Sequence, residues 1–192
     1  MQPIGRRVHV IGNSNSGKST LAQRLARALD ADFVELDALN WLPGWVGLNE
    51  TDPDELQRRI REATQGDAWI VAGSYAGHCQ RAFWSRLQTI VWLDLPLRVL
   101  LARFFQRSWR RWRTREVLWG TNIERFWPQF ALWRGSDSLL YWILFHHHRK
   151  RRDRLGNMQD PRWSHIHFVR LTSTSEVEAF ARAVEAEATG AG

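Results

Sequence analysis

The sequence predicts a three-layer α/β fold, in which helices cover both faces of a five-stranded parallel sheet. Strand-like and helix-like segments alternate along most of the chain, and this order is typical of parallel strands joined by right-handed crossovers. Residues 68–72 and 89–93 are almost continuously apolar, as expected of strands covered on both faces. The 192 residues are enough for a single domain, 1–192, that carries one insertion.

The first half of the chain supplies two further strands and two helices. Residues 7–11 form a short β-branched run that ends at a glycine, and residues 18–29 place apolar side chains at helical spacing. Residues 32–36 predict the next strand. Residues 53–63 begin with a proline after a Thr-Asp pair that can cap a helix, which indicates a helix start.

The second half of the chain closes the sheet after a long insertion. Residues 166–171 predict the last strand, and residues 175–188 predict a final helix capped by the Ser-x-x-Glu pattern of Ser175 and Glu178. Residues 96–164 lie between the fourth and fifth strands and read as a mostly helical insertion rich in arginine and tryptophan.

Composition gives the chain a strong positive charge without choosing its partner. The formal net charge is +7, the chain has 12 tryptophans, and all but two of its 27 lysines and arginines are arginine. This balance fits nucleic acid, an acidic membrane surface or phosphorylated small molecules. The single cysteine, Cys79, excludes an intrachain disulfide.

The distribution of apolar residues predicts no membrane span. The longest apolar run, 139–145, is about a third of the roughly 20 residues that a spanning helix needs. The first residues are charged and lead directly into a strand-like segment, unlike a secretory signal. We therefore expect a cytoplasmic protein, with monomer and dimer both open.

A phosphate-binding loop is the most specific motif in the chain. Residues 12–19 fit the pattern G-x-x-x-x-G-K-[ST] in full, after a predicted strand and before a predicted helix. Backbone N–H groups of such a loop cradle phosphates, the lysine reaches the β- and γ-phosphates, and the serine hydroxyl contacts Mg²⁺. The residues predicted to bind ATP are Gly12, Asn13, Ser14, Asn15, Ser16, Gly17, Lys18, Ser19 and Thr20.

The scarcity of lysine strengthens the assignment of Lys18. One of only two lysines, Lys18 and Lys150, occupies the motif position, where a compact charge on a flexible stem is required. Arginine, the cation that this chain uses almost everywhere else, is a planar fork and does not substitute there. We therefore predict Lys18 to be a catalytic residue.

Acidic residues at strand ends are candidates for the metal and the acceptor. Ligands of open α/β sheets bind beyond the carboxyl ends of the strands, where Asp37 and Asp94 follow the second and fourth strands. Asp37 is predicted to contact a substrate hydroxyl, to contact Mg²⁺ through water, or to act as a general base. The predicted metal set is Ser19, Asp37 and Asp94. Alternatively, Asp37 is a solvated turn residue and Asp94 caps the following helix.

Four segments carry a resemblance to a known family. Residues 12–19, 36–45, 69–75 and 91–96 resemble the adenylate-kinase-related P-loop proteins often labelled DNA topology modulation proteins, and the similarity covers nearly the whole chain. The resemblance implies the P-loop kinase fold, Mg·ATP as cofactor and the activity of a small nucleotide or metabolite kinase.

We expect a small acceptor to be held near Asp37, Trp41 and Tyr75. The comparison with the family also shows one departure. The third-strand motif of such proteins reads W-x-[IV]-D-G-N-Y, and Ala72 stands at the aspartate position here. Either Asp37 and Asp94 then organise the metal, or catalysis is weakened while nucleotide binding survives.

Arginines in the insertion are candidates for a lid over the transferred phosphate. Residues at positions 103, 107, 110 and 111 are arginines that share one helical face, in the region where kinases of this fold carry a lid. The predicted lid arginines are Arg107, Arg111, Arg113 and Arg115, of which Arg107, Arg111 and Arg115 are assigned to catalysis. A solvated cationic face is one alternative. A nucleic-acid or membrane contact with Trp109, Trp112 and Trp119 is the other.

Three functional hypotheses follow from the sequence. The leading one is a P-loop kinase that transfers the γ-phosphoryl group of Mg·ATP to a small acceptor, with a nucleoside monophosphate suggested by resemblance alone. The second is a nucleotide-regulated ATPase that binds nucleic acid, because of the charge and the Arg/Trp-rich insertion. The third is a degenerate nucleotide sensor, which the alanine at position 72 favours.

Overall fold

The five predicted strands form one parallel sheet. A computed structural model describes residues 4–114, 117–118, 122–123 and 151–190. The strand order is β2-β5-β1-β6-β9, and every neighbouring pair is parallel. The strands are β1 (Arg7–Gly12), β2 (Asp32–Glu35), β5 (Trp69–Ala72), β6 (Thr89–Leu93) and β9 (His167–Leu171). The predicted fold class, an α/β fold built on a five-stranded parallel sheet, is confirmed.

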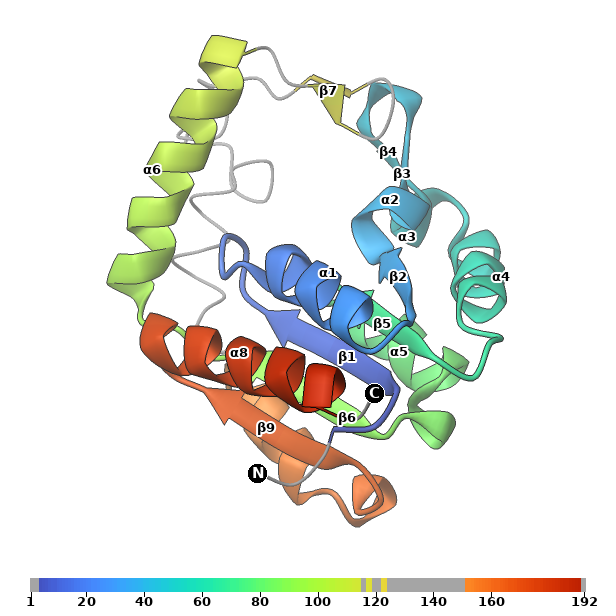
Figure 1. The fold of residues 1–192 in the computed structure, drawn as a ribbon. Helices are drawn as coiled ribbons and strands as arrows, with labels where there is room; N and C mark the ends of the chain where they lie inside the picture. Colours follow the sequence, from blue (N-terminus) through green and yellow to red (C-terminus); the bar gives the residue numbers. More distant parts are fainter. Residues whose placement is uncertain (1–3, 115–116, 119–121, 124–150, 191–192) are drawn as a thin grey trace.

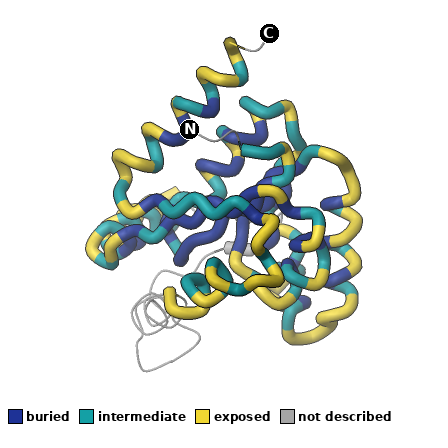
Figure 2. Tube along the Cα trace, turned by 90° about the horizontal axis from the view of Figure 1, so that it is seen from below, coloured by how far each residue is buried: buried dark blue, intermediate teal, exposed yellow. Residues whose placement is uncertain are grey.

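Helices cover both faces of this sheet. The helices α1 (Lys18–Ala28) and α8 (Thr174–Gly190) lie side by side on one face (Figure 1). The helices α4 (Pro53–Ala63) and α5 (Ala76–Ala82) contact each other and contribute to the buried cluster of the opposite face. The most deeply buried segments are the central strands (Figure 2).

Alternation of side chains along the strands explains their continuous apolar runs. In β5, Ile70 and Ala72 face the α1 and α8 layer, whereas Trp69 and Val71 face the opposite layer. Successive residues of a strand point to opposite faces, so a strand buried on both sides is apolar at every position. The excess of tryptophan is explained in part by the core, because Trp69, Trp84 and Trp92 are fully buried.

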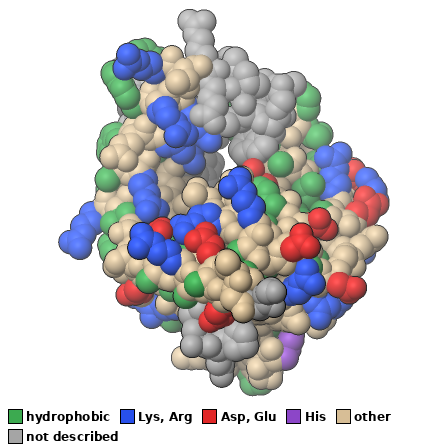
Figure 3. Space-filling model, viewed as in Figure 1, with side chains coloured by type: hydrophobic (Ala, Val, Ile, Leu, Met, Phe, Trp, Pro, Cys, Tyr) green, Lys and Arg blue, Asp and Glu red, His purple; other side chains and the backbone are tan. Residues whose placement is uncertain are grey.

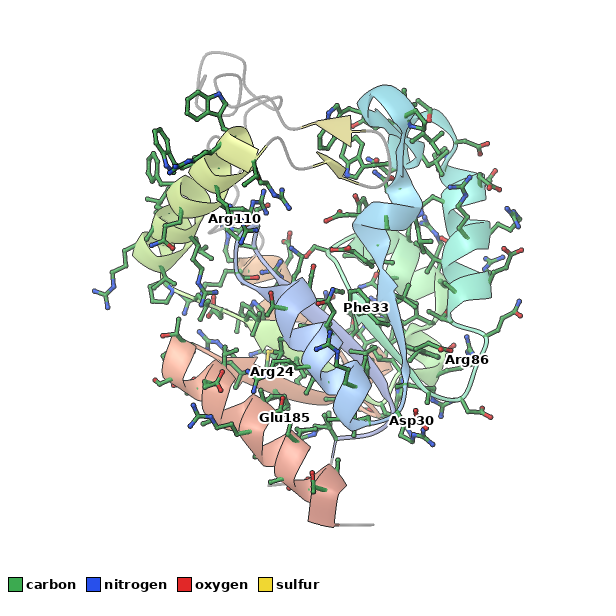
Figure 4. The ribbon with its side chains drawn as sticks, turned by 45° about the horizontal axis from the view of Figure 1, so that its top comes forward. Arg24, Asp30, Phe33, Arg86, Arg110 and Glu185 are labelled. Carbon is green, nitrogen blue, oxygen red and sulfur yellow. The ribbon has the colours of Figure 1, made fainter. Side chains whose placement is uncertain are left out.

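The last helix begins at Thr174, and its capping residue lies two positions before the predicted one. The hydroxyl Oγ of Ser173 accepts from the backbone N–H of Glu176 at 3.2 Å, so the capping residue is Ser173 and not Ser175. Glu178, the predicted partner of Ser175, instead accepts from Arg24 of α1 at 2.6 Å. Arg24 also pairs with Glu185, and Figure 4 shows these two side chains lying together between α1 and α8.

A short group of elements follows β2 and stands over the carboxyl edge of the sheet. It comprises α2 (Leu36–Asn40), β3 (Trp41–Leu42), the 3-10 turn η1 (Pro43–Trp45), β4 (Val46–Gly47) and α3 (Leu48–Thr51). The strands β3 and β4 pair in antiparallel fashion. Asn40 is fully buried, and its Oδ1 accepts from the backbone N–H of Asn49 at 2.8 Å, which closes this group into one unit.

The insertion between β6 and β9 is helical in most of its described part. The helix α6 (Leu97–Thr114) is its first element, residues 151–159 are helical, and η5 (Pro161–Trp163) precedes β9. The strands β7 (Val117–Leu118) and β8 (Asn122–Ile123) form an antiparallel ribbon, which the prediction of a mostly helical segment did not include. The ribbon lies beside η1.

Two predicted residues of the insertion cannot be placed. Arg115 and Trp119 lie outside the described residues.

Within the described residues, no helix is both long enough and apolar enough to cross a membrane.

Candidate nucleotide and acceptor site

The predicted phosphate loop joins β1 to α1 and has a tightly turned backbone. Asn15 and Gly17 adopt positive φ angles of 63° and 90°. The backbone N–H of Ser16 donates to the carbonyl of Asn13 at 3.2 Å, and that of Ser14 donates to Asn13 Oδ1 at 2.9 Å. Gly17 precedes the first turn of α1 and offers no side-chain cap, so the amides of that turn are suited to an anion.

Lys18 lies at the centre of the charges in this region. Burial lowers the pKa of its amine, and the charges of Asp37 and Glu35 act in the opposite direction. The positive charges of Arg107 and Arg154 lower the same pKa further. The structure therefore brings Lys18 within electrostatic reach of Asp37 and Arg107, two residues that the sequence assigned to catalysis.

Asp37 and Tyr75 form one unit beside the loop. Asp37 lies in α2, directly beyond the carboxyl end of β2, and Tyr75 follows β5. The Tyr75 hydroxyl donates to Asp37 Oδ1 at 2.9 Å. Burial and the charge of Asp37 raise the pKa of Tyr75, so its hydroxyl stays protonated and remains a donor. Trp41, the third predicted acceptor residue, packs edge to face on Trp45 with 5.6 Å between ring centroids.

Glu35 is a carboxylate of this site that sequence reasoning missed. The hydroxyl of Ser19, the predicted metal ligand, donates to Glu35 Oε1 at 2.8 Å. Glu35 closes β2, and in the parallel pairing of β2 with β5 it lies opposite Ala72. Paired residues of neighbouring strands project from the same face of a sheet. Position 72 on β5 carries no carboxylate, but the neighbouring strand β2 places the carboxylate of Glu35 beside it.

Asp94 is engaged elsewhere. Its Oδ2 accepts from Arg170 Nε at 2.9 Å and from Arg151 Nε at 3.0 Å, and its side chain is only 6% exposed. Two guanidinium groups therefore occupy the carboxylate that the sequence offered as a metal ligand. Because these ion pairs compete with any cation for Asp94, we leave it out of the candidate metal site.

A strained turn after β5 fastens the site to β1. Gly73 has a φ of 150°, and a Cβ atom at this position would lie 2.6 Å from the Cβ of Leu36, so only glycine fits. The Ser74 hydroxyl donates to the carbonyl of Gly12 at 2.9 Å, which links the turn to the phosphate loop. The turn thereby fixes the backbone that carries Tyr75.

His9 holds this turn from inside the core. Its Nδ1 accepts from the indole N–H of Trp84 at 3.3 Å, so the ring proton is on Nε2, which donates to the carbonyl of Gly73 at 3.1 Å. Burial lowers the pKa of His9 to about 3. The neutral imidazole therefore satisfies two buried polar groups at once.

The arginines of α6 reach the loop to different degrees. Arg103 Nη1 donates to the carbonyl of Ser16 at 2.6 Å, a contact that the predicted lid set did not include. Arg107 and Arg111 are half-buried, and Arg113 is exposed. Figure 3 shows Lys and Arg side chains gathered over α6 and below it on the same face.

Comparisons with known proteins show the fold and leave the family open. No protein-family model matches the chain, and no curated protein sequence matches it. A gluconokinase from Sinorhizobium meliloti 1021 aligns with a TM-score of 0.51 at 19% identity, over 98% of this chain and 94% of the other. A shikimate kinase from Bacteroides thetaiotaomicron aligns with a TM-score of 0.52 at 14% identity, over 94% and 97%.

The alignments with these two kinases, together with the strand order, define the fold class of the chain. The chain has the α/β fold of P-loop small-molecule kinases. The finer resemblance to the DNA topology modulation proteins stays a prediction.

The protonation of His9 predicts a measurable pH dependence of stability. The pKa of His9 in the folded protein, about 3, lies below its ordinary value of 6.5. On acidification the unfolded chain therefore binds a proton before the folded protein does, and the free energy of unfolding decreases as the pH drops below about 6.5. Between about pH 6.5 and pH 5 the loss from this group is about 1.5 kcal/mol. The variant His9→Gln keeps one donor and one acceptor. Between the same two pH values, its free energy of unfolding in urea should decrease less than that of the wild type, by this amount. Equal pH profiles for the two proteins would contradict the assignment.

Proposed function

We propose that the chain is a P-loop kinase that transfers the γ-phosphoryl group of ATP to a hydroxyl of a small acceptor. The observation that carries this proposal is the Asp37–Tyr75 pair, held at 2.9 Å within electrostatic reach of Lys18. A carboxylate beside a phosphate-loop lysine can orient an acceptor hydroxyl towards the γ-phosphate. The shared fold with small-molecule kinases supports the same reading.

Each residue of the site then has a defined task. The loop from Gly12 to Thr20 holds the phosphates of ATP, and Asp37 orients the acceptor hydroxyl and accepts its proton. The hydroxyl oxygen forms a bond to the γ-phosphorus while the bond from that phosphorus to the bridging oxygen of ADP breaks. Lys18 and Arg107 stabilise the negative charge of the transferred group. Tyr75 keeps the Asp37 carboxylate oriented.

Trp41 and Arg111 complete this proposal at its edges. Trp41 is half-buried in β3, next to the Asp37 helix, and is proposed as a wall of the acceptor site. Arg111 is half-buried on α6, one turn beyond Arg107, and is proposed as a second cation for the transferred group.

The residues beside the loop fit a magnesium ion. The hydroxyl of Ser19 and the carboxylate of Glu35 are oxygen ligands of the kind that Mg²⁺ prefers, and they lie in direct contact. Among the described residues, no three His, Cys, Asp or Glu side chains are grouped to hold a metal, and Mg²⁺ in kinases typically uses few protein ligands with waters and phosphates. When bound, Mg²⁺ neutralises charge on the β- and γ-phosphates. We assign Ser19 and Glu35 to hold it, with Asp37 acting through water.

Turnover with a panel of acceptors tests the kinase proposal. We expect ADP formation to rise above the bare ATPase rate with at least one hydroxylated small molecule. Lys18→Met should lower that rate about 100-fold or more, whereas Arg27→Met, which removes an exposed cation from the same helix, should not. ATP binding without acceptor-dependent turnover would support the nucleotide-sensor hypothesis instead.

Glu35 on β2 lies opposite Ala72 on β5, so a carboxylate at position 72 should restore Mg²⁺ affinity that is lost when Glu35 is removed. Glu35→Gln should raise the Mg²⁺ concentration needed for tight binding of a non-hydrolysable ATP analogue by about tenfold, measured by calorimetry. Ala72→Asp alone should give no gain, because it places a second negative charge beside Glu35. Glu35→Gln combined with Ala72→Asp should recover part of the Mg²⁺ affinity.

Thermal unfolding serves as the control for these variants, because Ala72 is buried and an aspartate there carries its own cost. The assignment of Glu35 is wrong if Glu35→Gln leaves the Mg²⁺ dependence of analogue binding unchanged while the protein stays folded.

A second candidate function, nucleic-acid binding, rests on the outer surface of α6. Phe105, Trp109 and Trp112 are 51%, 55% and 50% exposed, and they alternate with arginines along the helix. Aromatic rings beside cations are the elements with which proteins bind single strands.

Salt dependence tests this second candidate. Binding of a fluorescent single-stranded oligonucleotide should weaken steeply as salt rises, and the double variant Arg110→Gln, Arg113→Gln should reduce the log–log slope by about 1.4 if each arginine contacts one phosphate. No binding at about 50 mM salt would remove this candidate.

A further inference from the structure

Arg154 is a half-buried cation at the carboxyl edge of the sheet. It lies in the helical segment 151–159, and its guanidinium carbon is 5.8 Å from the centre of the Trp92 ring. Trp92 lies opposite Ile11 in the pairing of β6 with β1, one residue before the phosphate loop begins at Gly12. The Trp92 ring therefore holds the guanidinium beside the proposed site.

Arg154 has no hydrogen-bonded counter-ion within the described part of the chain. Asp94 and Asp153 attract it, but the Asp94 carboxylate is bonded to Arg151 and Arg170. Burial lowers the pKa of Arg154 to about 10, which reflects the cost of holding this charge away from water. Buried charges in proteins are normally paired, so a largely desolvated guanidinium that has no hydrogen-bonded counter-ion among the described residues is suited to receive an anion.

The neighbours of Arg154 place it on the acceptor side of the sheet. Leu155 and Met158 pack against the same buried cluster as Tyr75. Asn157 Oδ1 accepts from Gln80 of α5 at 3.4 Å, and α5 begins directly after Tyr75. Glu35, in contrast, lies on the α1 side, beside Ser19.

The charge of Arg154 reaches the reacting groups as well. It lowers the pKa of Lys18, as Arg107 does, so both arginines lie within electrostatic reach of the loop lysine. Arg107 belongs to α6 and Arg154 to the helical segment 151–159, so the two arginines approach Lys18 from different elements.

We propose that Arg154 binds an oxyanion of the phosphoryl acceptor, and that the acceptor is therefore a hydroxylated small molecule with a carboxylate or phosphate group. This inference rests on the proposed kinase function. The guanidinium carbons of Arg154 and Arg170 lie 5.8 Å and 5.0 Å from the centre of the Trp92 ring, but Arg170 is bonded to Asp94. A guanidinium without such a bond can make a two-pronged contact with an oxyanion. A neutral sugar would leave this charge unpaired and is disfavoured.

Matched pairs of acceptors test the proposal. Gluconate is compared with glucose, and adenosine monophosphate with adenosine, so that each pair differs in its anionic group. Binding is measured by calorimetry with a non-hydrolysable ATP analogue present, and turnover is measured as ADP formation. We expect binding only from an anionic member, weakened about 10- to 100-fold in Arg154→Met and less in Arg154→Lys. Affinity for the ATP analogue alone should stay unchanged.

Arg152→Met is the matched control, because Arg152 is an exposed cation of the same segment. It should leave acceptor binding unchanged. Melting temperatures of all variants separate lost binding from lost folding, and Arg154→Lys retains the charge where Arg154→Met perturbs packing on Trp92.

The outcomes separate this inference from the kinase proposal. Anion binding that depends on Arg154 without ADP formation would support an anion site at Arg154 and contradict the kinase. Turnover with neutral acceptors, or anionic acceptors that bind equally to wild type and Arg154→Met, would retain the kinase and overturn the inference. An equal loss of affinity for the ATP analogue would assign Arg154 to the nucleotide and overturn it too. Absence of any anion binding also overturns it.

Discussion

Repulsion among cations around one lysine is the constraint on which the candidate site depends. Among the described residues, the charges of Arg107 and Arg154 lower the pKa of Lys18, and those of Asp37 and Glu35 act in the opposite direction. The parallel sheet makes this arrangement possible, because the carboxyl ends of its strands meet at one edge. Glu35 ends β2, Asp37 follows it, and the phosphate loop follows β1. The natural complement of such a site is a polyanion such as a nucleotide.

The sheet was predictable because burial on both faces leaves a direct trace in the sequence. The strand predicted at 89–93 has the same bounds in the structure. The start of the last helix was not predictable to the residue, because Ser173 and Ser175 each precede a glutamate by three positions. In the structure, Glu178 accepts from the distant Arg24, whereas Glu176 accepts from the backbone N–H of Thr172 and donates its own N–H to Ser173.

The candidate site was predictable where one residue carries the signal, and not where the signal lies in a pair. Lys18 and Asp37 follow from a motif and from a strand end. Glu35 reads in the sequence as an ordinary polar residue of an amphipathic strand, and its role emerges only when the register sets it opposite Ala72. Arg154 belongs to no motif in the sequence, and the packing of its neighbours Leu155 and Met158 on the core is what removes it partly from water.

The contact between Arg103 and the phosphate loop gives α6 a mechanical property. The bond to the Ser16 carbonyl joins residues 87 positions apart, and charged hydrogen bonds of this kind contribute about 1.5–3 kcal/mol. The bonded peptide unit belongs to the loop, so this bond ties α6 to the loop backbone at the second turn of the helix. Arg107 and Arg111 lie one and two turns beyond this tie, so the same helix that bonds to the loop backbone also carries the two arginines proposed to contact the transferred group.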